Sequence, residues 1–206
     1  MKNLINRVLT GLATGWLTIA TAAVMSLPAH AAADTYTPHG GPAVAFIGNE
    51  IAFTDEFVGQ TFSCDQFDLH GTLISADLSR PLGTMAATWD QLDYGGCFNN
   101  IFGATTFDPI GTWGFTITGP EVGSVSPAKL ADVSFLLSAA GCSFNVAGDV
   151  SGTLDDVTGV FTPTGSTMTI ADDPAGFICP ILGFMKDDAI SVSGTWAITG
   201  LTITNP

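Results

Sequence analysis

Histidine and carboxylate side chains are the first candidates for chemistry in this 206-residue sequence. His39 and His70 are the histidines found after the first 31 residues, and Asp68 precedes His70 by two positions. Residues two apart on a strand project from the same face, so Asp68 and His70 could form an acid–base pair beside Ser63 or Ser75. The sequence offers no G-x-S-x-G motif that would activate such a serine, and polar alternation on an exposed strand explains both residues. We therefore predict a protein without catalytic residues.

Three adjacent aspartate pairs are the second candidate: Asp155–Asp156, Asp172–Asp173 and Asp187–Asp188. Each pair lies in a predicted loop, where aspartate side chains accept hydrogen bonds from nearby backbone N–H groups. Calcium prefers clustered carboxylate and carbonyl oxygens, but the regular D-x-[DN]-x-[DN]-G loop is absent from this sequence. A glycosidase would need two carboxylates about 5–9.5 Å apart. We expect no metal site and no cofactor, with weak calcium binding and an acidic-pair hydrolase as alternatives.

Four tryptophan and tyrosine residues could serve either binding or packing. Trp89 and Tyr94, in the stretch ATWDQLDYGGC, are the candidate ligand contacts. If exposed, their rings could stack on a sugar or a lipid tail, and if buried they would fill space in the core. Trp113 and Trp196 each follow a Gly-Thr pair on a predicted strand, and we predict both as core residues.

The first 31 residues have the organisation of a cleaved signal peptide. Lys2 and Arg7 precede a mostly apolar stretch over residues 8–27, and Ala29-His30-Ala31 supplies small residues for a signal peptidase. An uncleaved membrane anchor is the alternative, because the apolar stretch approaches the ~20 residues that a bilayer requires. The sequence therefore predicts a secreted protein of the extracellular medium or the cell envelope.

Removal of residues 1–31 would leave a strongly acidic chain. Three basic side chains then face nineteen acidic ones, which gives a net charge of −16. Nucleic acids and anionic membrane surfaces are bound through Lys and Arg, so both are poor candidate partners. A cell-envelope component or a small apolar ligand is the expected kind of partner.

The cysteines predict disulfide bonds, because an exported protein meets an oxidising compartment. The first two are 33 positions apart and the last two are 37 apart, which favours pairing within each half of the chain over pairing across the halves. The lack of any CxxC spacing argues against a metal site. The four residues are Cys64, Cys97, Cys142 and Cys179.

Landmarks around the cysteines recur in the same order in two halves. Gly71 lies 26 positions before Cys97, and Gly152 lies 27 positions before Cys179. Gly-Thr-Trp then follows the second cysteine of each half after a similar interval, and differences of one position are what loops tolerate. This order predicts an internal duplication.

The duplication also predicts the domain boundaries. Residues 43–206 are expected to form one domain, since a half of about 80 residues would have only a small core. The two halves are 43–119 and 129–206, and the Gly- and Pro-rich stretch 120–128 is the linker between them. Residues 32–42 are predicted to be a flexible mature N-terminus.

The residues between these landmarks alternate between apolar and polar, and many are β-branched or aromatic. Such alternation is typical of half-buried antiparallel strands. The stretch TWGFTIT at 112–118 and the stretch AISVSGTWAITGLTITN near the C-terminus are the clearest examples. We predict an all-β fold, an antiparallel sandwich or barrel formed by two pseudo-equivalent halves and stabilised by disulfides.

The sequence resembles small secreted actinobacterial proteins whose function is uncharacterised. The resemblance covers roughly residues 50–206 and implies an exported, disulfide-bonded β protein, with no catalytic residue carried over. The residues that carry it are Cys64, Gly71, Cys97, Trp113, Cys142, Gly152, Cys179, Gly194, Trp196 and the ending TITNP.

These features together favour a non-enzymatic structural or binding protein that is exported. A barrel that encloses a small apolar ligand is the first alternative, and it requires an internal cavity of roughly 300 Å³ or more. A cation-preferring envelope pore and the acidic-pair hydrolase are further alternatives.

Overall fold

The structure is a computed structural model that describes residues 35–205. The predicted signal peptide, residues 1–31, lies outside the described residues. Within residues 35–205, no helix has the length and apolar character needed to span a bilayer.

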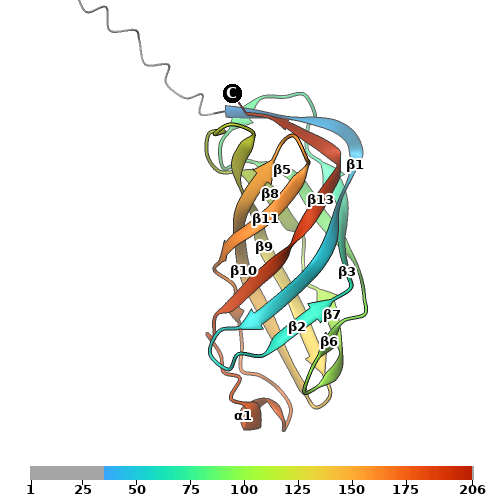
Figure 1. The fold of residues 1–206 in the computed structure, drawn as a ribbon, viewed down its shortest axis with the longest axis vertical. Helices are drawn as coiled ribbons and strands as arrows, with labels where there is room; N and C mark the ends of the chain where they lie inside the picture. The colour runs from blue at the N-terminus through green and yellow to red at the C-terminus, as the bar shows by residue number, and fades with distance from the viewer. Residues whose placement is uncertain (1–34, 206) are drawn as a thin grey trace, which may run out of the picture. The chain divides into compact units, whose positions relative to one another are not determined.

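The described chain folds into one antiparallel sheet that closes on itself (Figure 1). The ring of hydrogen-bonded strands runs from β1 through β3, β5, β8, β9, β10, β11 and β13 and back to β1. The sheet is therefore a barrel, which is one of the two all-β forms expected from the sequence. Its main strands are β1 (Thr35–Asp55), β3 (Gln66–Leu73), β5 (Met85–Gly95), β8 (Trp113–Ile117), β9 (Val125–Ala139), β10 (Cys142–Asp155), β11 (Val160–Ser166) and β13 (Ile190–Thr204).

Short strands complete the barrel at its two ends. At the end where β1 finishes, β2, β6 and β7 connect β1 to β9 and so continue the ring. The helix α1 (Cys179–Leu182) lies at the same end (Figure 1). β4 pairs with the start of β1, and β12 pairs with β10. The bounds are β2 (Thr61–Cys64), β4 (Arg80–Pro81), β6 (Phe98–Asn99), β7 (Gly103–Pro109) and β12 (Thr169–Ile170).

The predicted flexible N-terminus and the predicted linker both differ from the structure. From Thr35 onward the stretch 32–42 belongs to β1, because its backbone pairs with the end of β13 and with β4. The linker is shorter than 120–128, since β9 already begins at Val125 and its Pro127 and Ala128 pair with β10. In both places backbone pairing across the barrel orders residues whose Gly and Pro content indicated a loop.

Aromatic rings fill the interior of the barrel. Phe46 lies 4.5 Å from Trp89 and 5.0 Å from Phe115 between ring centroids. Further along the axis, a second group is spaced at 5.0–5.4 Å around Phe53, and a third at 5.1–6.2 Å lies at the end that carries α1. The second group adds Phe67, Phe107 and Phe135, and the third consists of Phe62, Phe102, Phe144 and Phe184.

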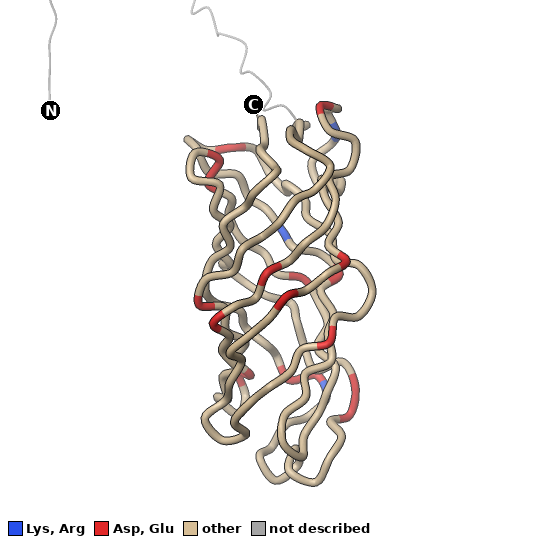
Figure 2. Tube along the Cα trace, turned by 90° about the vertical axis from the view of Figure 1, so that its right-hand side faces the viewer, with Lys and Arg blue, Asp and Glu red and all other residues tan. Residues whose placement is uncertain are grey.

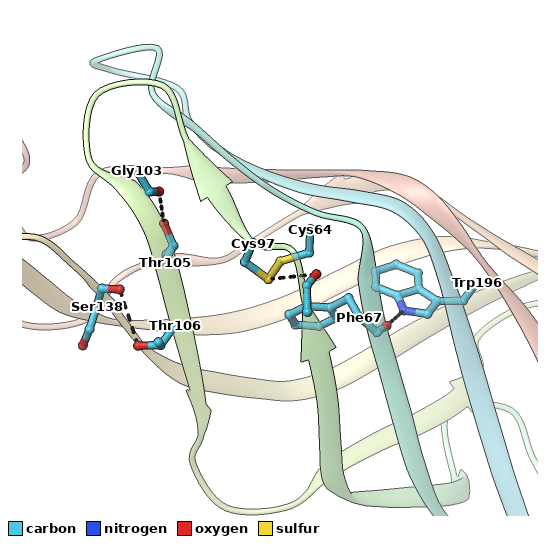
Figure 3. The surroundings of a disulfide bond; sticks show 9 residues. Cys64, Phe67, Cys97, Gly103, Thr105, Thr106, Ser138 and Trp196 are labelled. Carbon is cyan, nitrogen blue, oxygen red and sulfur yellow. Dashed lines mark hydrogen bonds between the residues drawn. A yellow bond between two sulfur atoms is a disulfide. The ribbon is translucent and has the colours of Figure 1, made fainter.

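The disulfides pair within each half, as the cysteine spacing favoured. Cys64 at the end of β2 bonds Cys97, which lies between β5 and β6 (Figure 3). Cys142 at the start of β10 bonds Cys179 at the start of α1. Each closes a loop of about 35 residues, worth on the order of 3–4 kcal/mol in the chain-entropy model. Both bonds hold the end of the barrel where the loops are longest.

Two glycines occupy comparable places in the two halves. Gly71 in β3 and Gly152 in β10 each mark a shift of register against the following strand. A Cβ at position 71 would lie 1.8 Å from the Thr88 carbonyl oxygen, and one at position 152 would lie 2.4 Å from that of Thr162. Only a residue without a side chain lets these strands approach so closely.

Gly71→Ala is expected to lower the free energy of unfolding by about 1–3 kcal/mol, because Thr88 must move away from the new methyl group. Urea denaturation measures this change. Gly165→Ala in β11 is the matched control, since no atom lies within 4 Å of its Cβ, and it should leave stability nearly unchanged. Equal losses in the two variants would contradict the packing explanation.

Candidate functional site

His70 contacts an aspartate on the outside of the barrel, but a different one from that suggested by the sequence. Its Nε2 lies 3.3 Å from Oδ2 of Asp93 on β5. Asp68 is buried and instead accepts hydrogen bonds from the Gly48 backbone N–H and from Gln66. Among residues 35–205, no serine or threonine hydroxyl is hydrogen-bonded to His70. The arrangement therefore lacks the nucleophile that acid–base catalysis of acyl transfer requires.

The other histidine fastens the start of β1. Nδ1 of His39 lies 2.6 Å from Oδ1 of Asp77, and its Nε2 lies 3.1 Å from the Thr204 hydroxyl on β13. These contacts join the two strands that close the barrel to the loop after β3. His39 thus has a structural role in this arrangement.

A polar hollow of about 390 Å³ adjoins His70 on the outer face of the sheet. Small side chains of β1 and β3 form its floor, and Asp90 and Gln91 form its rim. Its lining offers one imidazole and one carboxylate, without a metal-ligand set or an activated hydroxyl. It does not build a recognisable reaction centre.

The aspartate pairs mostly hold loops together. Asp155 Oδ1 accepts the backbone N–H groups of Val157 and Thr158, and Asp172 binds both the backbone and the side chain of Asn145. Asp188 accepts the N–H of Met185. Within the described residues, no group of three or more His, Cys, Asp or Glu side chains is placed to hold a metal.

The two candidate ligand contacts lie in different surroundings. Trp89 is buried, and its ring packs against Phe46 in the interior, so it is not available for stacking at the surface. Tyr94 is half-buried and packs edge-on against Phe107 at 6.0 Å. Both rings therefore contribute to packing, which is one of the two readings the sequence left open.

Trp113 and Trp196, which were predicted as core residues, are also buried, and each indole donates to a hydrogen-bond acceptor. Trp113 Nε1 donates to the Ser134 carbonyl on β9, at 3.0 Å. Trp196 Nε1 donates to the Phe67 carbonyl on β3, at 3.1 Å (Figure 3). The Trp196 indole reaches past Gly48, its partner on β1, where a Cβ would lie 2.4 Å from the same carbonyl oxygen. Each tryptophan thus fixes one strand against another strand.

The packed interior limits what the described barrel can enclose. The hollow beside Trp89 and Trp113 holds only about 10 Å³, far below the roughly 300 Å³ of a small-molecule site. Aromatic rings are buried in three groups, around Phe46, Phe53 and Phe62, and they occupy much of the interior. Neither an enclosed apolar ligand nor an acid-lined pore finds support in this packing.

Large apolar side chains gather instead on the loops at one end of the barrel. Of the eleven large hydrophobic side chains exposed among residues 35–205, six lie where β1 ends, and they are 49–75% exposed. A soluble domain rarely gathers so many in one place without an interaction to serve. We call this set the apolar loop end: Phe57, Phe98, Ile101, Phe177, Ile181 and Met185.

Buried polar side chains fix the backbone at two residues of the apolar loop end, Phe57 and Ile101. Asp55 is fully buried, and its Oδ1 accepts the backbone N–H groups of Phe57 and Val58. Asn99, also buried, accepts the N–H of Ile101 through Oδ1 and donates to the Thr61 carbonyl. Such turns fix the backbone just before the exposed residue. The exposure of Phe57 and Ile101 is therefore built into the fold.

Phe177, Ile181 and Met185 lie on or beside the short helix α1. Proline follows Cys179 at the start of this short helix, and Gly183 ends it with a left-handed φ of 87°. The Cys142–Cys179 bond and the hydrogen bond from Ile178 N–H to the Gly141 carbonyl fix this segment to the β9–β10 turn. Phe177 and Ile181 are thus presented by a segment that is covalently tied to the barrel.

Acidic residues are spread along the length of the barrel, and basic residues are sparse (Figure 2). Burial and the neighbouring carboxylate of Asp188 raise the pKa of Asp55 above its ordinary value, although two backbone N–H groups oppose this shift. Oδ2 of Asp55 has no hydrogen-bond partner among the described residues. At neutral pH the buried charge of Asp55 therefore lowers the free energy of unfolding.

Comparison with known proteins gives no relative for this chain. No protein-family model, no curated protein and no solved structure matches it.

The sequence analysis did not identify the apolar loop end. A usable signal was present, because FVG at 57–59 and GFICPILGFM at 176–185 place large apolar residues beside Gly and Pro, outside any alternating strand pattern. Large apolar residues at predicted loop positions are therefore the signal in the sequence that indicates these exposed side chains.

Asp55→Asn is expected to raise the free energy of unfolding at pH 8 by about 1 kcal/mol, because the amide replaces a buried charge and keeps the Oδ1 acceptor. The folded protein binds the Asp55 proton more tightly than the unfolded chain, so the wild-type protein regains this stability as the pH falls through the raised pKa towards the ordinary value of 3.8.

Urea denaturation at several pH values measures this effect. The variant should show a weaker increase in stability on acidification than the wild-type protein. Asp108→Asn, at an exposed position, is the charge-matched control. A loss of stability in Asp55→Asn at pH 8 would show that the ionised carboxylate is needed there.

Proposed function

We propose that this chain is an exported, non-enzymatic binding protein that attaches to an uncharged lipid surface of the cell envelope through its apolar loop end. The observation that carries the proposal is the set of six large apolar side chains, 49–75% exposed, on loops at one end of a rigid barrel. Full burial of one such side chain contributes about 1.5–3 kcal/mol, so six partly exposed ones supply enough to offset the cost of association.

A lipid surface suits the shape of this end better than a flat protein partner. The tips come from separate segments, the β1–β2 turn, the β6–β7 turn and the segment around α1, so each can enter an apolar layer independently. Phenylalanine is typical of the apolar face that interfacial segments bury at the headgroup boundary, and binding there strengthens with the apolar area buried.

Charge argues for an uncharged or zwitterionic surface. After loss of residues 1–31 the chain would carry a net charge of −16, and Lys186 is the basic residue in the segment that carries α1. An anionic leaflet would repel such a protein. The lipids bound are therefore expected to lack net negative charge.

Export is the second part of the proposal. The leader organisation of residues 1–31 supports it, and the two disulfides fit an oxidising, extracellular environment. The internal duplication remains a proposal as well, supported by one disulfide in each half and by the matching register shifts at Gly71 and Gly152. An origin among secreted actinobacterial proteins belongs to the same proposal.

Flotation with phosphatidylcholine vesicles tests the proposal. The purified protein should float with the vesicles, and the double variant Phe57→Ser/Phe177→Ser should lose most of this binding. Val122→Ser/Val157→Ser is the matched control, because these valines are 78% and 82% exposed at the opposite end of the barrel. It should bind as the wild-type protein does. Vesicles containing phosphatidylglycerol should bind less protein.

Two results would overturn the proposal. The first is a wild-type protein that does not float with phosphatidylcholine vesicles. The second is a dimer in analytical ultracentrifugation that only the Phe57→Ser/Phe177→Ser variant abolishes, which would assign the apolar loop end to self-association.

A further inference from the structure

The opposite end of the barrel contains a buried polar cluster that the proposed function does not use. Ser126 at the start of β9 is fully buried, and its hydroxyl donates to Oδ2 of Asp156 at 2.9 Å. Asn205, which is 2% exposed just after β13, donates through Nδ2 to the Ser126 hydroxyl and to the Gly119 carbonyl. Three segments far apart in the sequence therefore meet at one hydroxyl group.

Two oxygen atoms in this cluster have no donor. Oδ1 of Asp156 and Oδ1 of Asn205 are both buried and have no hydrogen-bond partner among residues 35–205. The carbonyl of Gly119 fixes the orientation of the Asn205 amide, since only the nitrogen can donate to it. A buried acceptor left unpaired costs about 1–3 kcal/mol. Both atoms belong to side chains that share the Ser126 hydroxyl, so one occupant that pairs with both would stabilise the cluster.

The charge around the cluster is negative. Burial, and then the carboxylates of Glu121 and Asp155, raise the pKa of Asp156 to about 6, although its bond from Ser126 opposes the shift. The basic side chains of the described residues do not neutralise it. Lys129 pairs with Asp149 at 2.8 Å, Arg80 binds backbone carbonyls, and Lys186 lies at the other end of the barrel, just after α1. Asp156 is thus ionised at pH 7.5 without a cation beside it.

We propose that Asp156 and Asn205 bind a calcium ion through their unpaired Oδ1 atoms, with Glu121 contributing negative charge at the rim. The donors are a carboxylate and an amide, whose oxygens are the hard ligands that calcium takes in irregular numbers. A site of this kind is compatible with the lack of three clustered acidic or histidine ligands, because its second ligand is an amide.

The bound ion would fasten the end of β13 to the start of β9 and to the β10–β11 turn. Extracellular modules of this kind bind calcium with dissociation constants of about 10⁻⁴–10⁻³ M. Binding to the folded state alone stabilises it by mass action, so calcium should raise the unfolding temperature in the millimolar range. This inference does not depend on lipid binding.

A proton is the competing occupant of the cluster. A protonated Asp156 would carry no charge and could itself donate a hydrogen bond from Oδ1. Calcium and the proton therefore compete, and calcium binding should weaken as the pH falls below about 6.

The test is calorimetric titration of the chelator-treated, purified protein with calcium chloride at pH 7.5, together with thermal unfolding. We expect one saturable site, a rise of several degrees in unfolding temperature at 5 mM calcium, and at least a tenfold loss of affinity in Asp156→Asn. Glu121→Gln, at a half-buried position just before the turn at 122–125, should weaken binding several-fold. Asp108→Asn, an exposed change of equal charge, should bind calcium as the wild-type protein does.

Several results would overturn the proposal. They are no calcium-dependent rise in the wild-type protein, an equal rise with sodium chloride at the same ionic strength, or equal losses of affinity in Asp156→Asn and Asp108→Asn. If the free energy of unfolding rises on acidification but does not change with calcium, a proton and not calcium occupies the cluster. Failed lipid binding with intact calcium binding would overturn the proposed function and leave this site standing.

Discussion

The pairing of β1 with β13 closes the sheet, and the remaining structure depends on that closure. The two strands are paired along most of their length, from Thr37 and Thr204 at one end to Asp55 and Ile190 at the other, with two register shifts on the way. Closure removes the exposed edges that an open sheet would offer to other chains. It also gives every strand an inner face, which aromatic side chains fill. Because β1 is at the start of the domain and β13 is at its end, the barrel is complete only when both halves have folded.

Because aromatic side chains fill the interior, we expect any binding site to lie on the outer surface of the barrel. Rings such as Phe46, Phe53 and Phe67 occupy the space where a ligand-binding barrel keeps its cavity. The two ends of the barrel then differ in chemistry. One end carries exposed apolar loops tied down by disulfides, and the other carries buried polar groups around Ser126 with two unpaired oxygens. A rigid barrel that separates these ends can use each of them independently.

Local patterns in the sequence predicted most of the fold, but they did not predict the residues of the apolar loop end. Alternation predicted β8 and β13 as strands, and the interval between cysteines favoured the pairing that the structure has. The start of β1 was expected to be flexible, because Gly40 and Gly41 indicate a turn unless a distant strand pairs with them. His70 was matched with Asp68 by its spacing, whereas the pairing of β3 with β5 brings it to Asp93. Contacts between strands are decided by register, and a single sequence does not display register.

What the sequence determined by itself is the class of protein: acidic, disulfide-bonded and all-β, with Trp113 and Trp196 on apolar strand faces. These properties follow from composition and from periodicity along neighbouring residues. The tertiary structure decided that the sheet closes, that Trp89 lies inside, and that Phe57 and Ile181 lie outside. It also brought Ser126, Asp156 and Asn205 together from three distant segments. The physical reason is that burial and partnership depend on which strand lies beside which, and backbone pairing around the whole ring settles that.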